Sequence, residues 1–271
     1  MKPASLTVEI AGHALVLSSL RAVFDPALRC LFVADAHFGK DAVFRARGIP
    51  VPIGSTADNL MRLDILISEF EPAMLVFLGD LLHAREAHAA ETLDALHVWR
   101  ARHAGLRVVL VEGNHDRHAG ALPEMLRVEY VQERWRIGPW ALCHHPQLVE
   151  GAYVLAGHAH PVCRVTTRTD SVRVPCFRFG TACGVLPAFG SFIGGAREEG
   201  RVAGERVFLV VEERVIEVVR WQFCQRLPAS SLLLFACCER TVGRPLMLPE
   251  PDVSAGGRFA GPPALRKVAA R

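Results

Sequence analysis

Five short motifs rich in Asp, His and Asn follow one another within the first 160 residues of this 271-residue chain: Asp35-Ala36-His37, Gly79-Asp80, Gly113-Asn114-His115-Asp116, Cys143-His144-His145-Pro146 and Gly157-His158-Ala159-His160. Carboxylate oxygens, amide oxygens and neutral imidazole nitrogens bind divalent cations, and the motifs supply enough of them for two. A pair of cations about 3.5–4 Å apart can stabilise both the attacking and the leaving oxygen of a phosphate ester. The motifs therefore indicate a metal-dependent phosphoesterase.

The first three motifs offer oxygen and nitrogen ligands. Asp80 is the expected bridge between two cations, because a carboxylate has two oxygens and Gly79 lets the backbone pass close to the metals. Asp35 and His37 lie two residues apart in an extended segment, so their side chains point the same way and can bind one ion together. Asn114 adds an amide oxygen.

The last two motifs add imidazoles. His158 and His160 repeat the spacing of two residues, so both rings can face one cleft. His144 and His145 compete for a single ligand position, and the sequence favours His144 because an apolar run leads directly to it. None of these ligands is a thiolate, which points to manganese, iron or zinc rather than to calcium.

His115 and Asp116 are the expected catalytic pair. The departing oxygen of a phosphate ester gathers negative charge and needs a proton or a cation beside it. We expect His115 to give that proton, and Asp116 to orient its imidazole and raise its pKa.

Composition is that of an ordinary globular protein, with 51% hydrophobic and 22% charged residues. The net charge of +3 resides in the segment from Glu239 onward, which has six basic and three acidic residues, so net charge alone gives no argument for a nucleic acid partner. Lys40, Arg45 and Arg47, which follow the first motif, are the candidates for contacts with substrate phosphates. No apolar run is long enough to span a membrane or to form a secretion signal, so we expect a cytoplasmic protein without a membrane partner.

Alternating apolar strands and amphipathic helices predict an α/β fold. Strands are expected at 30–34, 74–78 and 106–111, each ending directly before one of the first three motifs, and helices at 56–70 and 87–103. In such sheets ligands gather beyond the carboxyl ends of the strands, so the three motifs should meet on one edge.

After residue 127 the pattern changes to short strands, which predicts a second, mostly antiparallel sheet. We expect one catalytic domain over residues 1–220 and a partly disordered tail over 221–271, where Pro, Gly and basic residues accumulate. The expected strands of this sheet are 128–132, 135–143, 153–156, 162–167, 172–179, 207–211 and 215–219.

The ordered motifs resemble those of the calcineurin-like metallophosphoesterase superfamily. A closer similarity to the bacterial ligase-associated DNA damage response endonucleases lies in Ala34-Asp35-Ala36-His37-Phe38-Gly39-Lys40, in the segment from Phe44 to Pro52, and in Leu186-Pro187-Ala188-Phe189-Gly190-Ser191-Phe192 with Gly194-Gly195. This resemblance covers about residues 5–220. The tail after Trp221 lies outside this resemblance.

The resemblance implies a four-layer α/β sandwich with two mixed β-sheets flanked by helices. It also implies two manganese ions and cleavage of single-stranded DNA in DNA repair, together with an ATP-dependent DNA ligase and a helicase. On the family's pattern one ion would be held by Asp35, His37, Asp80 and His160, and the other by Asp80, Asn114, His144 and His158, with His115 assisting catalysis.

Two other functions fit part of these observations. A phosphoesterase of the same fold could act on small nucleotides, pyrophosphates or phosphoproteins, and a non-catalytic scaffold could keep the fold without the reaction. The Phe-rich segment 186–195 could stack DNA bases, although a packed turn is favoured slightly. The histidines near the expected helices, His83, His88, His97, His103 and His118, are given no chemistry.

Overall fold

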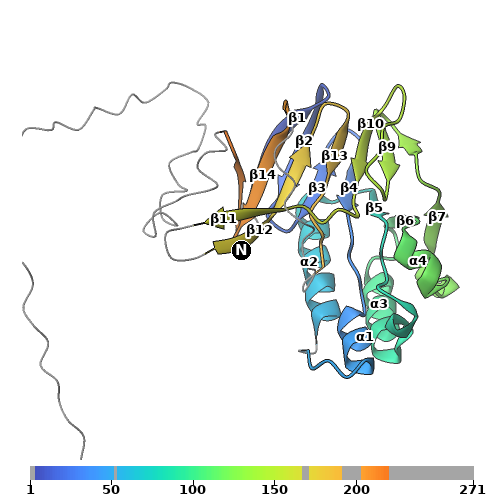
Figure 1. Ribbon diagram of the computed structural model, residues 1–271. Helices are drawn as coiled ribbons and strands as arrows, with labels where there is room; N and C mark the ends of the chain where they lie inside the picture. Colours follow the sequence, from blue (N-terminus) through green and yellow to red (C-terminus); the bar gives the residue numbers. More distant parts are fainter. Residues whose placement is uncertain (1–3, 52–53, 167–170, 191–202, 220–271) are drawn as a thin grey trace, which may run out of the picture. The chain divides into compact units, whose positions relative to one another are not determined.

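Two β-sheets pack face to face in the computed structural model of the chain, which describes residues 4–51, 54–166, 171–190 and 203–219 (Figure 1). The first sheet has its strands in the order β1-β2-β3-β4-β5-β6-β7. Their bounds are β1 Ser5–Ile10, β2 His13–Ser18, β3 Ala22–Asp25, β4 Cys30–Val33, β5 Met74–Leu78, β6 Arg107–Val111 and β7 Val128–Val131.

The two halves of the first sheet are connected differently. Strands β1 to β4 are antiparallel neighbours joined by short turns, whereas β4 to β7 are parallel. Parallel neighbours need a long crossover connection, and helices supply most of it here. As a result β4, β5 and β6 end at the same edge of the sheet, each just before one of the first three motifs, as the sequence predicted.

The helices of the described residues contribute to one apolar cluster on the outer face of the first sheet. Leu60, Leu63 and Leu66 of α2 pack there, because their spacing places them on one side of the helix. The helices are α1 Lys40–Ala46, α2 Ser55–Phe70, α3 Ala90–Arg102 and α4 Asn114–Ala119, with two 3₁₀ turns, η1 Arg85–His88 and η2 Glu124–Leu126. The sequence predicted α2 and α3 but neither α1 nor α4, both of which are short.

The second sheet has the order β15-β14-β12-β13-β10-β9-β8, with β11 paired to β12. Most of its pairs are antiparallel, as expected, but β9, β10 and β13 run parallel. The strands are β8 Trp135–Ile137, β9 Trp140–Cys143, β10 Tyr153–Ala156, β11 Val162–Thr166, β12 Ser171–Phe179, β13 Cys183–Val185, β14 Arg206–Val211 and β15 Arg214–Glu217.

Two expectations for the second sheet were wrong. The strand near residue 128 is β7, which pairs with β6 at the edge of the first sheet. The expected single strand 135–143 is a hairpin, because Gly138 with a φ of 53° begins a turn between β8 and β9.

The central strands of the first sheet are buried on both faces. In β4, Leu31 and Val33 belong to the cluster beneath the helices, whereas Cys30 and Phe32 belong to the cluster between the sheets. The expected α/β fold with two mixed sheets flanked by helices is therefore confirmed. In the described part of the chain, the layers are the helices, the first sheet and the second sheet, in that order.

The expected tail, residues 221–271, lies outside the described residues. Within the described residues, none of the helices is both long and apolar enough to cross a membrane.

Candidate metal centre

The predicted ligands follow the ends of strands, where the backbone turns sharply. Several of them have a positive φ, a conformation that costs a non-glycine residue on the order of 1–3 kcal/mol and that clusters at functional sites. The surrounding hydrogen bonds hold the chain in this shape: the Asp35 amide donates to Gly79 O at 3.3 Å, and the His37 amide donates to Asp80 O at 2.9 Å. The positive φ angles are 52° at Asp35, 46° at His37, 51° at Asp80, 64° at His158 and 43° at His160.

One group of donors surrounds Asp35. His37 and His160 each place a ligand atom within 4.8 Å of a carboxylate oxygen of Asp35 and of each other. His160 Nε2 lies 3.3 Å from Asp35 Oδ1, and His37 Nε2 lies 3.8 Å from Asp80 Oδ2. Asp35 is fully buried, and its Oδ1 atom has no hydrogen-bond donor among the described residues. A buried carboxylate oxygen that faces imidazole nitrogens is the environment that a cation would stabilise.

A second group of donors surrounds His144. The carbonyl oxygen of Leu78 accepts from His144 Nδ1 at 3.1 Å, so in the neutral ring the lone pair is on Nε2. That Nε2 atom lies 2.9 Å from Asn114 Oδ1, 3.5 Å from Asp80 Oδ1 and 3.0 Å from His158 Nδ1. Several of these atoms carry lone pairs and no proton to share, so a cation at their centre would relieve their repulsion.

Asp80 faces both groups, because one of its carboxylate oxygens approaches His37 and the other approaches His144. Burial raises the pKa of Asp80, and the neighbouring His144 opposes that rise. Burial likewise lowers the pKa of His37, so that its ring is neutral and its lone pair is available to a metal. The donor set and its geometry therefore fit two cations that share Asp80.

Two glycines make this close approach possible. A Cβ atom on Gly79 would lie 2.1 Å from His144 Nδ1, and one on Gly157 would lie 2.7 Å from Asp35 Oδ2. Gly79 also has a φ of 82°, which favours glycine. Glycine at these two positions leaves room for the ligand side chains of His144 and Asp35, which a larger residue would displace.

The structure separates the roles of His144 and His145. His144 is fully buried, at the end of β9, whose Trp140 is anchored between the sheets and donates its indole N–H to Asp25 at 2.6 Å. His145 is 42% exposed, and its Nδ1 donates to Glu133 Oε1 at 2.9 Å. The contacts of His144 with Asn114 and Asp80 agree with the preference drawn from the sequence.

Asp116 has a different role from the one expected. Instead of orienting His115, its carboxylate accepts hydrogen bonds from the backbone amides of Asp80 at 2.7 Å and Gly113 at 2.9 Å. It also accepts from Leu81 and Leu82 at 2.8 and 3.3 Å. Asp116 therefore fixes the loops after β5 and β6 to one another. Sequence spacing could not reveal the contacts with Asp80, Leu81 and Leu82, because they join segments more than 30 residues apart.

His115 is instead oriented by His83, a residue that the sequence analysis left without a role. His115 Nδ1 donates to the backbone oxygen of His83 at 2.7 Å, and the two rings stack with centroids 5.1 Å apart. His83 Nδ1 also lies 3.3 Å from His37 Nδ1, and burial lowers the pKa of His83 to about 4. The signal that could have found His83 is its position three residues after Asp80.

The basic residues after the first motif have protein partners. Arg45 is paired with Asp41 and Glu91, and Arg47 lies 3.6 Å from Glu86. The Arg47–Glu86 pair is exposed and therefore weak, which leaves Arg47 open to a contact with phosphate, whereas Asp41 is buried and holds Arg45 more firmly. The Lys40 amide donates to His37 O at 3.3 Å, which places Lys40 directly beside the site.

The Phe-rich segment is packed into the core where the structure describes it, and Ala188 forms a parallel bridge with Ala34. Phe189 is fully buried in the cluster beneath the helices, which excludes it from stacking on bases. Phe192 lies outside the described residues.

The fold is a sandwich of two mixed β-sheets with helices on one side, and oxygen and nitrogen donors cluster where its parallel strands end. These features define an α/β metallophosphoesterase fold. Residues 28–174 match the calcineurin-like phosphoesterase family. This match spans more than half of the chain, which therefore belongs to that family.

A solved structure gives the comparison more detail. The chain is similar to the nuclease MPE of Pseudomonas putida, with 41% identity and a TM-score of 0.71 over 79% of this chain and 100% of that one. It also aligns with Yfce, a phosphoesterase from E. coli, with 17% identity and a TM-score of 0.36 over 70% of this chain and 97% of that one. No curated protein sequence matches the chain. The family match identifies the chain as a metal-dependent phosphoesterase, and the similar structure of 41% identity is that of a nuclease.

Proposed function

We propose that the protein is a manganese-dependent endonuclease that cleaves phosphodiester bonds in single-stranded DNA during repair. The observation that carries this proposal is the convergence of two donor groups on Asp80. The choice of a nucleic acid substrate is supported by the similarity to a nuclease along that protein's whole length.

Each of two cations would be held by one of the two donor groups. Asp80 would bridge, and the carboxylate, amide and imidazole donors suit manganese, with iron and zinc as alternatives. When bound, the ions would activate water for attack on phosphorus and neutralise charge on the phosphate. Asp35, His37 and His160 would hold one ion, and Asn114, His144 and His158 the other.

We assign to His115 the role of giving a proton to the leaving group. Its side chain is 39% exposed, and its Nε2 lies 3.9 Å from Asp80 Oδ2, at the edge of the donor groups. With Nδ1 committed to the carbonyl of His83, a protonated His115 presents its second N–H at Nε2. From there it can give a proton to the departing oxygen. Lys40, whose charge already acts on His37 and His83, is the cation best placed to contact a neighbouring phosphate.

The experiment that tests this function is a panel of substrates supplied with manganese. It compares single-stranded DNA, double-stranded DNA, cyclic nucleotides, a pyrophosphate, a phosphopeptide and an aryl phosphodiester. We expect internal cleavage of single-stranded DNA to be fastest, and to disappear in EDTA. Faster hydrolysis of a small nucleotide or a phosphopeptide would reassign the substrate, and failure on every substrate with bound metal would favour a non-catalytic scaffold.

The cellular setting is part of the same proposal. The resemblance to the ligase-associated endonucleases implies that an ATP-dependent DNA ligase and a helicase would act in the same repair process in the cytoplasm. A nicked or flapped DNA whose repair by such a ligase is faster in the presence of this protein would support that setting. Repair that proceeds equally well without it would contradict it.

A further inference from the structure

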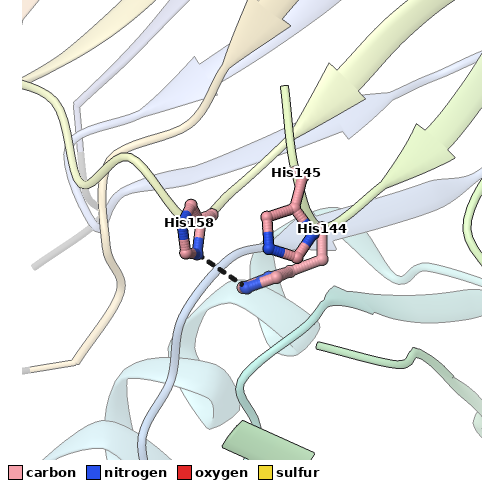
Figure 2. A group of neighbouring side chains, drawn as sticks. All are labelled: His144, His145 and His158. Carbon is pink, nitrogen blue, oxygen red and sulfur yellow. Dashed lines mark hydrogen bonds between the residues drawn. The ribbon is translucent and has the colours of Figure 1, made fainter. Parts of the chain in front are cut away.

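A third imidazole lies beside two of the proposed ligands. His144, His145 and His158 each place one ring nitrogen within 4.8 Å of those of the other two. Figure 2 shows the three side chains gathered together. The ring centroids are 4.7 Å apart for His144 and His145, 4.8 Å for His144 and His158, and 4.4 Å for His145 and His158. We call these residues the histidine triad.

His145 is oriented in the way that metal-binding histidines are. The Oε1 atom of Glu133 accepts from His145 Nδ1 at 2.9 Å and from the backbone amides of His144 and His145 at 3.0 and 2.7 Å. Because a carboxylate only accepts, the proton of the neutral ring is on Nδ1 and the lone pair is on Nε2. A carboxylate behind the far ring nitrogen typically fixes the tautomer of a metal ligand and increases its basicity.

His144 has the same form. His144 donates Nδ1 to the carbonyl of Leu78, which leaves its Nε2 lone pair toward His158. His158 is exposed, so an ion and a water molecule can reach the triad from solvent.

We propose that the histidine triad binds one zinc ion through three imidazoles, as an alternative to the second ion of the proposed phosphoesterase centre. Three neutral nitrogens suit zinc, which takes three or four nitrogen or sulfur ligands in a tetrahedral arrangement, better than manganese, which prefers oxygen. Zinc is also the tighter binder of the two ions at a given site. This assignment rests on the proposed function with manganese as the activating ion, and it makes zinc an inhibitor of the manganese enzyme, because the triad withdraws His144 and His158 from the second manganese.

The test measures zinc binding to the metal-free full-length protein, by competition with a coloured chelator and without any substrate. His145→Gln removes the third imidazole, and His97→Gln, on the exposed side of α3, is the matched control. We expect His145→Gln to weaken zinc binding by more than about tenfold, the low end of the loss seen when a supporting residue alone is removed. Manganese binding should change by less than about twofold, since Asp80 and Asn114 are untouched.

Two further measurements keep the proposal falsifiable. Glu133→Gln keeps all three imidazoles and should weaken zinc binding by about 10–100-fold. Cobalt bound in place of zinc should give the strong visible absorption of four-coordinate cobalt in the wild type and lose it in His145→Gln. Equal zinc affinity in wild type and His145→Gln would overturn the proposal. A protein that binds zinc as described, yet cleaves nothing with manganese, would overturn the proposed function and leave the triad standing.

Discussion

Asp116 holds the backbone of Asp80, since Asp116 Oδ2 accepts a hydrogen bond of 2.7 Å from the Asp80 amide. The same carboxylate accepts from the Gly113 amide at 2.9 Å, and so joins the loop after β5 to the loop after β6. Asp116, which is not one of the proposed metal ligands, thus fixes the position of Asp80, the residue proposed to bridge two metal ions.

Replacing Asp116 should therefore weaken the fold as well as the metal centre. We expect Asp116→Ala to lower the free energy of unfolding by about 2–4 kcal/mol, because hydrogen bonds to a charged acceptor contribute about 1.5–3 kcal/mol and buried amides lose their partner. Urea denaturation in EDTA measures this loss without any contribution from metal. Asp94→Ala, an exposed carboxylate on α3, is the control and should leave the midpoint unchanged. Equal midpoints for the two variants would refute the role of Asp116.

The ends of three parallel strands were predictable from the sequence. Each of β4, β5 and β6 is an apolar run buried on both faces, and such a run ends where polar residues begin. Parallel neighbours bring their carboxyl ends together, so the meeting of Asp35, Asp80 and Asn114 followed from the strands alone.

The parts of the site that escaped prediction depend on contacts between loops. Asp116 bonds to backbone amides 34 to 36 residues away, and His83 reaches the site through its own carbonyl. A backbone partner leaves no pattern in the sequence. The helix α1 was missed because its seven residues are too few to show a periodic apolar face.

Gly79 offers a test of close packing that separates backbone strain from steric conflict. Gly79→Ala would place a Cβ atom 2.1 Å from His144 Nδ1, whereas Gly12→Ala would meet no atom within 4 Å. The two glycines have φ angles of 82° and 80°, so the backbone strain is the same in both variants. We expect only Gly79→Ala to lose affinity for manganese, measured by isothermal titration calorimetry. Similar affinity in both variants would mean that the His144 position tolerates displacement.

His115 should affect turnover without affecting metal content. His115→Ala removes the group that we assign to the leaving oxygen, and general acid catalysis contributes about 10²- to 10⁴-fold. We expect kcat for DNA cleavage to fall within that range while the bound manganese stays at the wild-type level. An aryl diester with a good leaving group should be affected less, because it needs no proton. An equal loss on both substrates would argue against proton donation by His115.

Two thiols, the buried Cys143 and the partly buried Cys183, should make the protein sensitive to alkali. Burial raises the pKa of Cys183 to about 11 from an unfolded value of 9.0, and it raises the pKa of Cys143 as well. The stability that depends on a protonated Cys183 is fully present below pH 9 and is lost as the pH rises toward 11, because the unfolded chain releases its proton first. Under reducing conditions, urea midpoints should fall less between pH 8 and pH 10 in Cys183→Ala than in the wild type. Parallel decreases would contradict this assignment.

The count of bound manganese tests the metal centre most directly. The protein is saturated with manganese, passed through a desalting column and assayed for metal per chain by mass spectrometry, beside Asp80→Ala prepared in the same way. We expect about two ions per wild-type chain, and fewer than one in Asp80→Ala because both donor groups lose their common ligand. Wild-type protein that retains no manganese, or an Asp80→Ala variant that retains two ions, would contradict a centre built on Asp80.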